Sequence, residues 1–184
     1  MNLNYKRKRR IAWILTVSII ILSVFILGGW KLESKRTSVQ NYFFDGKNGF
    51  SIANDINVRR ECGYNLLTIG ERVKADPKKI TALKDAISVS HDAMTVREYF
   101  EANTALTNAF DSLYSHLLNS DISQEDKRLS AKQSDEFESR EKTIQKDLYN
   151  EKALAFNETI AKFPANLIAI LSGINRVELF RNGG

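Results

Sequence analysis

The sequence predicts an all-α protein, in which one N-terminal transmembrane helix is followed by an antiparallel bundle of about four long helices. Three observations support this prediction. Residues 11–30 are apolar and carry no charge, no glycine occurs from Pro77 to Phe163, and apolar residues recur at helical spacing. Strand-rich domains need frequent turns, which this glycine-free stretch does not offer. We therefore divide the chain into a basic tail (1–10), a transmembrane helix (11–30), a linker (31–51) and a helical bundle (52–181).

Residues 11–30 have the length and composition of a membrane-spanning helix. Twenty residues extend ~30 Å as a helix, which matches a bilayer's hydrocarbon core. Trp13 and Trp30 lie near the two ends, where indole rings favour the interface. The alternative is a cleaved signal peptide, whose apolar stretch is usually shorter and ends in small residues. Here the stretch ends at Gly28-Gly29-Trp30-Lys31, so we expect an uncleaved anchor.

The charge distribution predicts the orientation of this helix. All of the net charge of +5 lies in the run Lys6–Arg10, and the chain after Trp30 is neutral on balance. Three basic residues follow the helix closely, which are Lys31, Lys35 and Arg36. The positive-inside rule then favours a cytoplasmic N-terminus and an extracytoplasmic domain in the cell membrane, with the reversed orientation as the alternative. A neutral body also argues against nucleic acid as a partner.

After the anchor, residues 31–51 contain Gly46, Gly49 and several aromatic residues, which indicates a linker or broken helix. Its aromatic rings would lie at the lipid headgroups or pack against the base of the domain. The first bundle helix is expected at about 52–74, where Cys62, Leu66 and Ile69 share one face.

Asp76-Pro77 is a helix-start signal, and it opens a predicted second helix from Pro77 to about Asn119. Such a helix would be a rod of ~65 Å. A turn at 119–123 leads to a third helix over 124–163, which Pro164 ends or kinks. A shorter helix is expected at 166–180, followed by a frayed tail. A continuous coiled coil is the alternative, but the apolar stripe drifts between Val96 and Asn103.

Several short motifs resemble the LemA family. The resemblance is carried by Arg59-Arg60-Glu61 and Asn65-Leu66-Leu67 in the first bundle helix and by a C-terminal signature. That signature consists of Tyr149-Asn150, Phe156-Asn157, Ile160 and Phe163-Pro164-Ala165-Asn166, and Phe180 closes it. Tyr64 stands where the family usually has proline. The resemblance implies a membrane-anchored bundle of long helices, in a family without an established catalytic role. The family-motif residues are Arg60, Asn65, Tyr149, Asn150, Phe156, Asn157, Phe163, Pro164 and Asn166.

These motif residues have two interpretations. In the first, Asn150 and Asn157 lie seven residues apart on one helical face and hydrogen-bond across helices, which would fix the register of the bundle. Arg60 would then form an ordinary ion pair. In the second, Arg60, Asn65, Tyr149 and Asn150 form a polar groove that binds a partner. The spacing favours the structural interpretation.

The sequence predicts no catalytic, cofactor-binding or metal-binding residues. His91 and His116 would be ~37 Å apart along one helix, so they could not share an ion. Cys62 is the only cysteine and lies on an apolar face, as a buried thiol would. The carboxylates of an acidic cluster lie at helical spacing from Arg140, Lys142 and Lys146, which indicates solvated ion pairs; the cluster consists of Asp135, Glu136, Glu138 and Glu141.

The function expected from these features is a non-catalytic interaction or scaffold module at the cell envelope. The lipid bilayer is the expected partner of Ile11 to Trp30, together with proteins of the same membrane. The alternative is an extracytoplasmic ligand-sensing or accessory domain that acts through a membrane partner, and an unrecognised enzyme is a third possibility. The oligomeric state stays open, since Gly28-Gly29 is not a GxxxG motif.

Overall fold

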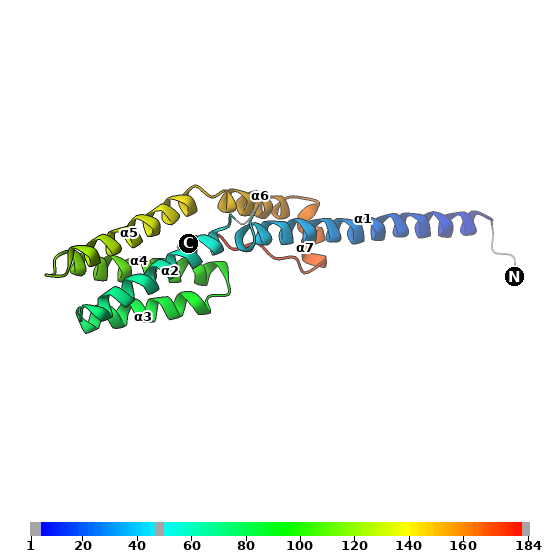
Figure 1. The fold of residues 1–184 in the computed structure, drawn as a ribbon. Helices are drawn as coiled ribbons and strands as arrows, with labels where there is room; N and C mark the ends of the chain where they lie inside the picture. Colours follow the sequence, from blue (N-terminus) through cyan, green and yellow to red (C-terminus); the bar gives the residue numbers. More distant parts are fainter. Residues whose placement is uncertain (1–4, 47–49, 182–184) are drawn as a thin grey trace. The chain divides into compact units, whose positions relative to one another are not determined.

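The computed structural model describes residues 5–46 and 50–181, and this part of the chain is helical with no β-strand (Figure 1). The predicted all-α class is therefore confirmed. Residues 1–4 of the basic tail, 47–49 of the linker and 182–184 of the C-terminal tail lie outside the described residues. The helices are α1 (Tyr5–Phe44), α2 (Ile52–Arg72), α3 (Pro77–Asp92), α4 (Val96–Leu118), α5 (Gln124–Gln145), α6 (Tyr149–Ala161) and α7 (Ala165–Leu171).

The chain forms two compact units. The first unit comprises Met1–Val39 and Leu154–Val177, and the second comprises Gln40–Ala153 and Glu178–Gly184. This division differs from the single domain predicted over 52–181, because residues 154–177 group with the N-terminal helix. Apolar residues of that segment explain the grouping. They are buried in the first unit together with Leu32, and include Phe156, Ile160, Ile168, Ala169 and Ile174.

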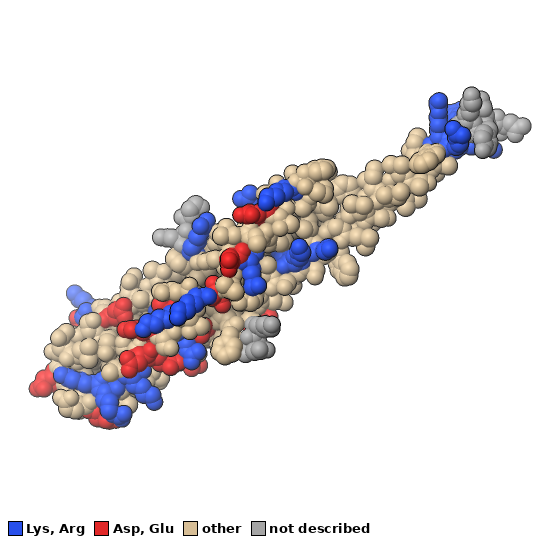
Figure 2. Space-filling view, turned by 90° about the horizontal axis from the view of Figure 1, so that it is seen from above, with Lys and Arg blue, Asp and Glu red and all other residues tan. Residues whose placement is uncertain are grey.

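Helix α1 is longer than the predicted transmembrane segment, and the linker expected at 31–51 is helical as far as Phe44. No glycine or proline occurs between Lys31 and Phe44, so nothing in the sequence stops the helix there. It ends where Gly46 adopts a φ of 64° and its N–H bonds to Asn41 O at 3.0 Å. Most large apolar side chains of residues 11–30 are exposed, and Figure 2 shows the basic residues at the N-terminal end of this uncharged stretch.

In the second unit, α2 contacts α3, α4 and α5, and so lies at the centre of the helical bundle. The face predicted from Cys62, Leu66 and Ile69 is buried, as expected. Ser51 caps α2, since its side chain accepts a hydrogen bond from the Asn54 N–H. The core joins these residues to apolar side chains of the neighbouring helices, including Leu83, Ile87, Leu106, Phe110, Leu113, Leu117 and Phe137.

The two long rods predicted for residues 77–163 are each broken, so those predictions of continuous helices were wrong. Helix α3 ends at Asp92, and Thr95 begins α4 with a reciprocal capping box to Glu98. The apolar stripe drifted at this place because a turn lies there. The second break lies between α5 and α6, where the Asp147 carboxylate accepts a hydrogen bond from the Tyr149 N–H at 2.7 Å.

The final helix is also shorter than the one expected over 166–180. Helix α7 ends at Leu171, and Gly173 follows with a φ of 66°, the left-handed conformation that ends many helices. Residues 174–180 are not helical. Backbone groups of this segment form hydrogen bonds with three side chains of α6, those of Tyr149, Asn150 and Asn157.

Candidate functional site

The most deeply buried charge in the second unit is Arg59 of α2, whose side chain is 1% exposed. Its Nη1 lies 2.7 Å from Glu141 Oε2 and also donates to Asn103 Oδ1. Its Nη2 donates to Thr107 Oγ1 at 2.9 Å. The guanidinium therefore joins α2 to both α4 and α5. Burial lowers the pKa of Arg59, although the neighbouring Glu141 carboxylate opposes that change.

An aromatic stack completes the surroundings of this arginine. The Arg59 Cζ lies 3.9 Å from the ring centroid of Phe137. That ring stacks on Phe110, with the two centroids 3.9 Å apart and the rings 6° from parallel. A planar guanidinium can stack and donate in its own plane at once, which a lysine ammonium cannot do. The Arg59-Arg60-Glu61 motif does not distinguish its two arginines in sequence, and it is Arg59 that falls on the buried face of α2.

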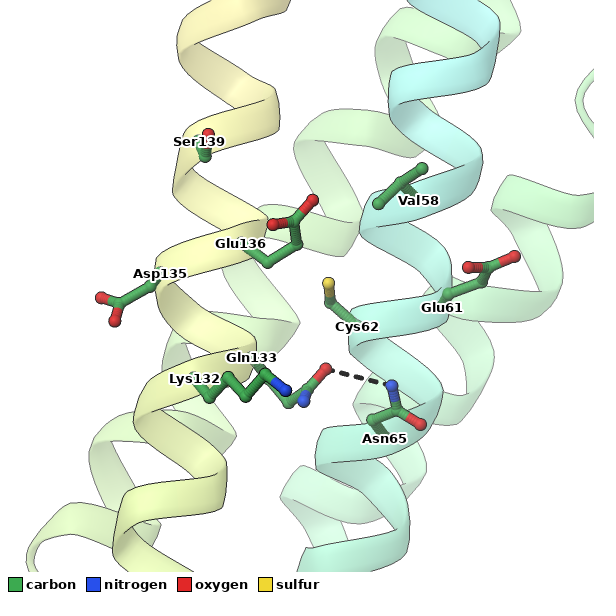
Figure 3. A pocket seen from close by; sticks show the side chains of 9 residues that line it. All are labelled: Val58, Glu61, Cys62, Asn65, Lys132, Gln133, Asp135, Glu136 and Ser139. Atoms are coloured by element: carbon green, nitrogen blue, oxygen red, sulfur yellow. Dashed lines mark hydrogen bonds between the residues drawn. The ribbon is translucent and has the colours of Figure 1, made fainter.

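A groove of 620 Å³ lies beside this network, between α2 and α5. Figure 3 shows Cys62 and Glu136 directed into the space between the helices, whereas Asp135 points away from it. Asn65 Nδ2 donates across the groove to Gln133 Oε1 at 3.0 Å. The groove is lined by Val58, Glu61, Cys62, Asn65, Lys132, Gln133, Asp135, Glu136 and Ser139.

The charges of the groove are mainly acidic. Glu136 is paired with Arg140, whose Nη2 lies 2.6 Å from its Oε1, and Arg140 also reaches Asp55 at 3.4 Å. Burial raises the pKa of Asp55, and the hydrogen bond from Arg140 opposes that shift. Burial also raises the pKa of the Cys62 thiol to about 11. The thiol is thus protonated at neutral pH, which is the state of an unreactive cysteine.

The family-motif residues of α6 bind the C-terminal segment. Asn150 exchanges two hydrogen bonds with the backbone of Phe180, of 3.0 and 2.8 Å. Asn157 exchanges two with Val177, each of 2.8 Å. One of these asparagine clamps lies in each unit. The interpretation that both asparagines bond across helices was therefore wrong, because their partner is non-helical backbone.

Tyr149 belongs to an aromatic cluster at the end of α1. Its ring centroid is 5.0 Å from that of Phe43, and Phe43 lies 5.7 Å from Phe180. The Tyr149 hydroxyl donates to Glu178 O at 2.6 Å, and burial raises its pKa. Phe43 is fully buried, so this ring of the predicted linker packs within the protein and does not lie among headgroups.

The hypothetical groove of Arg60, Asn65, Tyr149 and Asn150 is not formed. Arg60 donates to Ser90 O at 3.1 Å, and Asn65 faces α5 through Gln133. Tyr149 and Asn150 bind the C-terminal segment instead. The remaining motif residues belong to the first unit, where Phe156 is buried, Phe163 is exposed and the Asn166 carboxamide accepts from the Leu167 N–H.

Within residues 5–46 and 50–181, no three His, Cys, Asp or Glu side chains form a group that could hold a metal ion. His91 and His116 lie near the ends of different helices, α3 and α4. Comparison of the chain with models of known families, with curated proteins and with solved structures found no match.

Proposed function

We propose that this protein is a single-pass membrane protein whose helical unit acts as a non-catalytic interaction module at the cell envelope. The proposal includes LemA-like identity, an antiparallel arrangement of the bundle helices, a cytoplasmic N-terminus and an extracytoplasmic body. The observation that carries it is the exposed apolar surface of α1, which lies directly after a run of basic residues.

The surface of α1 supports the membrane attachment. Residues 11–30 expose large apolar side chains around the whole helix, among them Trp13, Ile14, Ile19, Leu22 and Leu27. This helix is long and apolar enough to cross a bilayer. A helix satisfies its own backbone hydrogen bonds, so it can enter hydrocarbon without leaving polar groups unpaired. Water would be a poor solvent for such a surface.

The LemA-like identity is supported by the roles of the residues that carry the resemblance. Asn150 and Asn157 clamp the segment that leads to Phe180, the residue that closes the family signature. The arginine pair and Asn65 lie on α2, the central helix of the bundle, and each makes a hydrogen bond to another helix. Residues that join separate segments of a fold by hydrogen bonds are the kind that a family motif would contain.

The groove between α2 and α5 is the proposed contact with a protein partner. Glu61 on α2 and Asp135 on α5 flank the groove, with their carboxylates directed away from the space between the two helices (Figure 3), and neither takes part in an ion pair among the described residues. Lys132 is the one basic residue of its lining. The surplus of carboxylates suits a partner segment that carries lysine or arginine, in line with electrostatic complementarity at interfaces. A protonated Cys62 at its base supports binding over covalent chemistry.

Site-specific photo-crosslinking in intact cells tests this proposal. A photoreactive amino acid replaces Asn65, at the groove, or Thr104, an exposed residue of α4. We expect a reproducible protein adduct from position 65 and none from position 104. The double substitution Glu61→Lys and Asp135→Lys should abolish the adduct, because it reverses the charge that attracts the partner.

The matched control is Asp85→Lys, which changes an exposed carboxylate of α3 in the same unit. It should leave the adduct at position 65 unchanged. An adduct that survives reversal of both groove charges would contradict the groove as the contact. A protein without any reproducible adduct at position 65 would contradict the interaction function itself.

A further inference from the structure

Four large apolar side chains near α7 in the first unit are exposed, and we call them the α7 patch: Phe163, Leu167, Ile170 and Leu171. Phe163 is 82% exposed and Ile170 is 75% exposed. The last three lie at spacings of three and four residues, so they share one face of the short helix. Ile168 and Ala169 on the other side are buried. An exposed apolar face of this kind marks an interaction surface in most proteins.

The position of α7 on α1 indicates what covers this patch. A side-chain carbon on Gly28 would lie 2.8 Å from Ile168 Cδ1, and one on Gly29 would lie 2.5 Å from Ser172 Oγ. Both glycines therefore allow α7 to pack closely against the backbone of α1. They belong to the last turn of the apolar stretch that ends at Trp30. The α7 patch thus lies at the depth where the membrane-spanning segment meets the interface.

The charges around the patch agree with this depth. Residues 163–175 contain no Asp, Glu, Lys or Arg, although charged residues make up 27% of the chain. Lys162 precedes this uncharged stretch and Arg176 follows it, and both are exposed. Basic side chains at the ends of an apolar segment can extend to lipid phosphates while the segment itself lies deeper. Trp30, which is also exposed, is of the residue type that favours the interface.

We infer that the α7 patch enters the interfacial layer of the same bilayer that α1 spans, and so forms a second attachment of the chain to the membrane. The inference rests on the proposed membrane anchoring by α1. The lipid acyl chains cover Phe163, Leu167, Ile170 and Leu171, and the headgroups meet Lys162 and Arg176. This is the arrangement of a short interfacial helix beside a spanning one.

Fluorescence quenching on the full chain in phosphatidylcholine nanodiscs tests the inference. With Cys62→Ala as background, the environment-sensitive dye NBD is attached to Ile170→Cys, to Leu22→Cys in α1 or to Glu158→Cys in α6. Leu22 is exposed within the apolar stretch, and Glu158 is an exposed charged residue of the same unit as α7. We expect labels at 22 and 170 to show blue-shifted emission and quenching by doxyl lipids, and the label at 158 to be quenched by iodide.

The labels separate failure of the inference from failure of the anchor. Lipid quenching at 22 with iodide quenching at 170 would overturn the second attachment and leave the anchor intact. A label at 170 that neither quencher reaches would show a protein occupant, such as a second copy of the chain, and would also overturn it. Loss of lipid quenching at 22 would overturn the anchoring and the inference together.

Discussion

Arg59 links three helices of the second unit, α2, α4 and α5. It is buried, ion-paired with Glu141, hydrogen-bonded to Asn103 and Thr107, and stacked on Phe137. Taking a guanidinium out of water is costly, and the cost is met only when nearly all of its donors are paired. Here Nε is the one side-chain nitrogen of Arg59 without a partner among the described residues. Such a centre specifies which faces of three helices meet.

We expect Arg59→Ala to lower the free energy of unfolding by about 3 kcal/mol, because it removes the cation that pairs with Glu141 and the donor to Asn103 Oδ1, and opens a cavity beside Phe137. Urea unfolding of the full chain in detergent, followed by circular dichroism, measures the change. Arg59→Lys should have an intermediate effect, since an ammonium keeps the charge but cannot stack and donate as a planar fork does.

The adjacent arginine is the matched control for this prediction. Arg60 makes one hydrogen bond to Ser90 O and is only partly buried, so Arg60→Ala should cost less than about 1 kcal/mol. Equal losses from the two alanine substitutions would contradict the role assigned to the Arg59 network.

The sequence predicts that Arg59 lies on the buried face of α2, but it does not identify the side chains that Arg59 contacts. The apolar stripe of α2 recurs at Cys62, Leu66 and Ile69, and extending it backwards reaches position 59. A charged residue is unusual on a buried face and needs polar partners there. The partners of Arg59 lie far away in sequence, since Asn103, Thr107 and Glu141 follow it by 44, 48 and 82 residues. Spacing along one helix predicts which residues share a face, but it does not identify the side chains that meet them.

At the scale of elements, each asparagine clamp joins one residue of helix α6 to one residue of the C-terminal segment, Asn150 to Phe180 and Asn157 to Val177. Each carboxamide offers one donor and one acceptor to one residue's backbone. The side chains thereby take the place of a neighbouring strand.

We expect Asn150→Ala to speed amide hydrogen exchange at Phe180, and Asn157→Ala to do the same at Val177. Each substitution removes two hydrogen bonds, which contribute about 1–3 kcal/mol together. Hydrogen exchange of the full chain, read by mass spectrometry of C-terminal peptides, measures the effect. Asn166→Ala is the control, because its carboxamide bonds only to the next residue's N–H. Unchanged exchange in both clamp variants would contradict this role.

The boundaries of the elements were predicted well where a local signal exists. Asp76-Pro77 begins α3, and α5 begins at Gln124 after the predicted turn, as expected. The turns that break the two predicted rods contain neither glycine nor proline, so they leave little trace in the sequence. The Thr95–Glu98 capping box was a visible signal for one of them. Residues 174–180 are non-helical because Asn150 and Asn157 bind their backbone groups. Local helix propensity cannot predict hydrogen bonds to residues so distant in sequence.

For the whole molecule, the proposed orientation in the membrane follows most directly from the sequence, because it depends on the charge pattern alone. The net charge of +5 equals the charge of the run Lys6–Arg10, and Figure 2 shows acidic and basic side chains interspersed over the visible face beyond the uncharged stretch of α1. Orientation in a membrane depends on such flanking charges. The groove and the α7 patch, in contrast, require contacts between segments that only the folded chain defines.

We expect the native protein in intact cells to expose its helical body to external protease. Replacing all five residues of the run Lys6–Arg10 by glutamine should reverse the orientation, because Lys31, Lys35 and Arg36 then dominate the flanking charge. Protease accessibility before and after permeabilisation measures this. Replacing Lys31, Lys35 and Arg36 by glutamine should leave the native orientation unchanged. A body that is protected in intact cells would contradict the assigned topology.

The clamped C-terminal segment also has a genetic consequence. A nonsense codon just after Gly173 would remove residues 174–181, so Tyr149, Asn150 and Asn157 would all lose the backbone groups to which they bond. Phe43 and Phe100 would lose the ring of Phe180 as well. Late truncation alleles should therefore behave as nulls cleared by cellular quality control, and affinity tags placed within this stretch should be equally harmful.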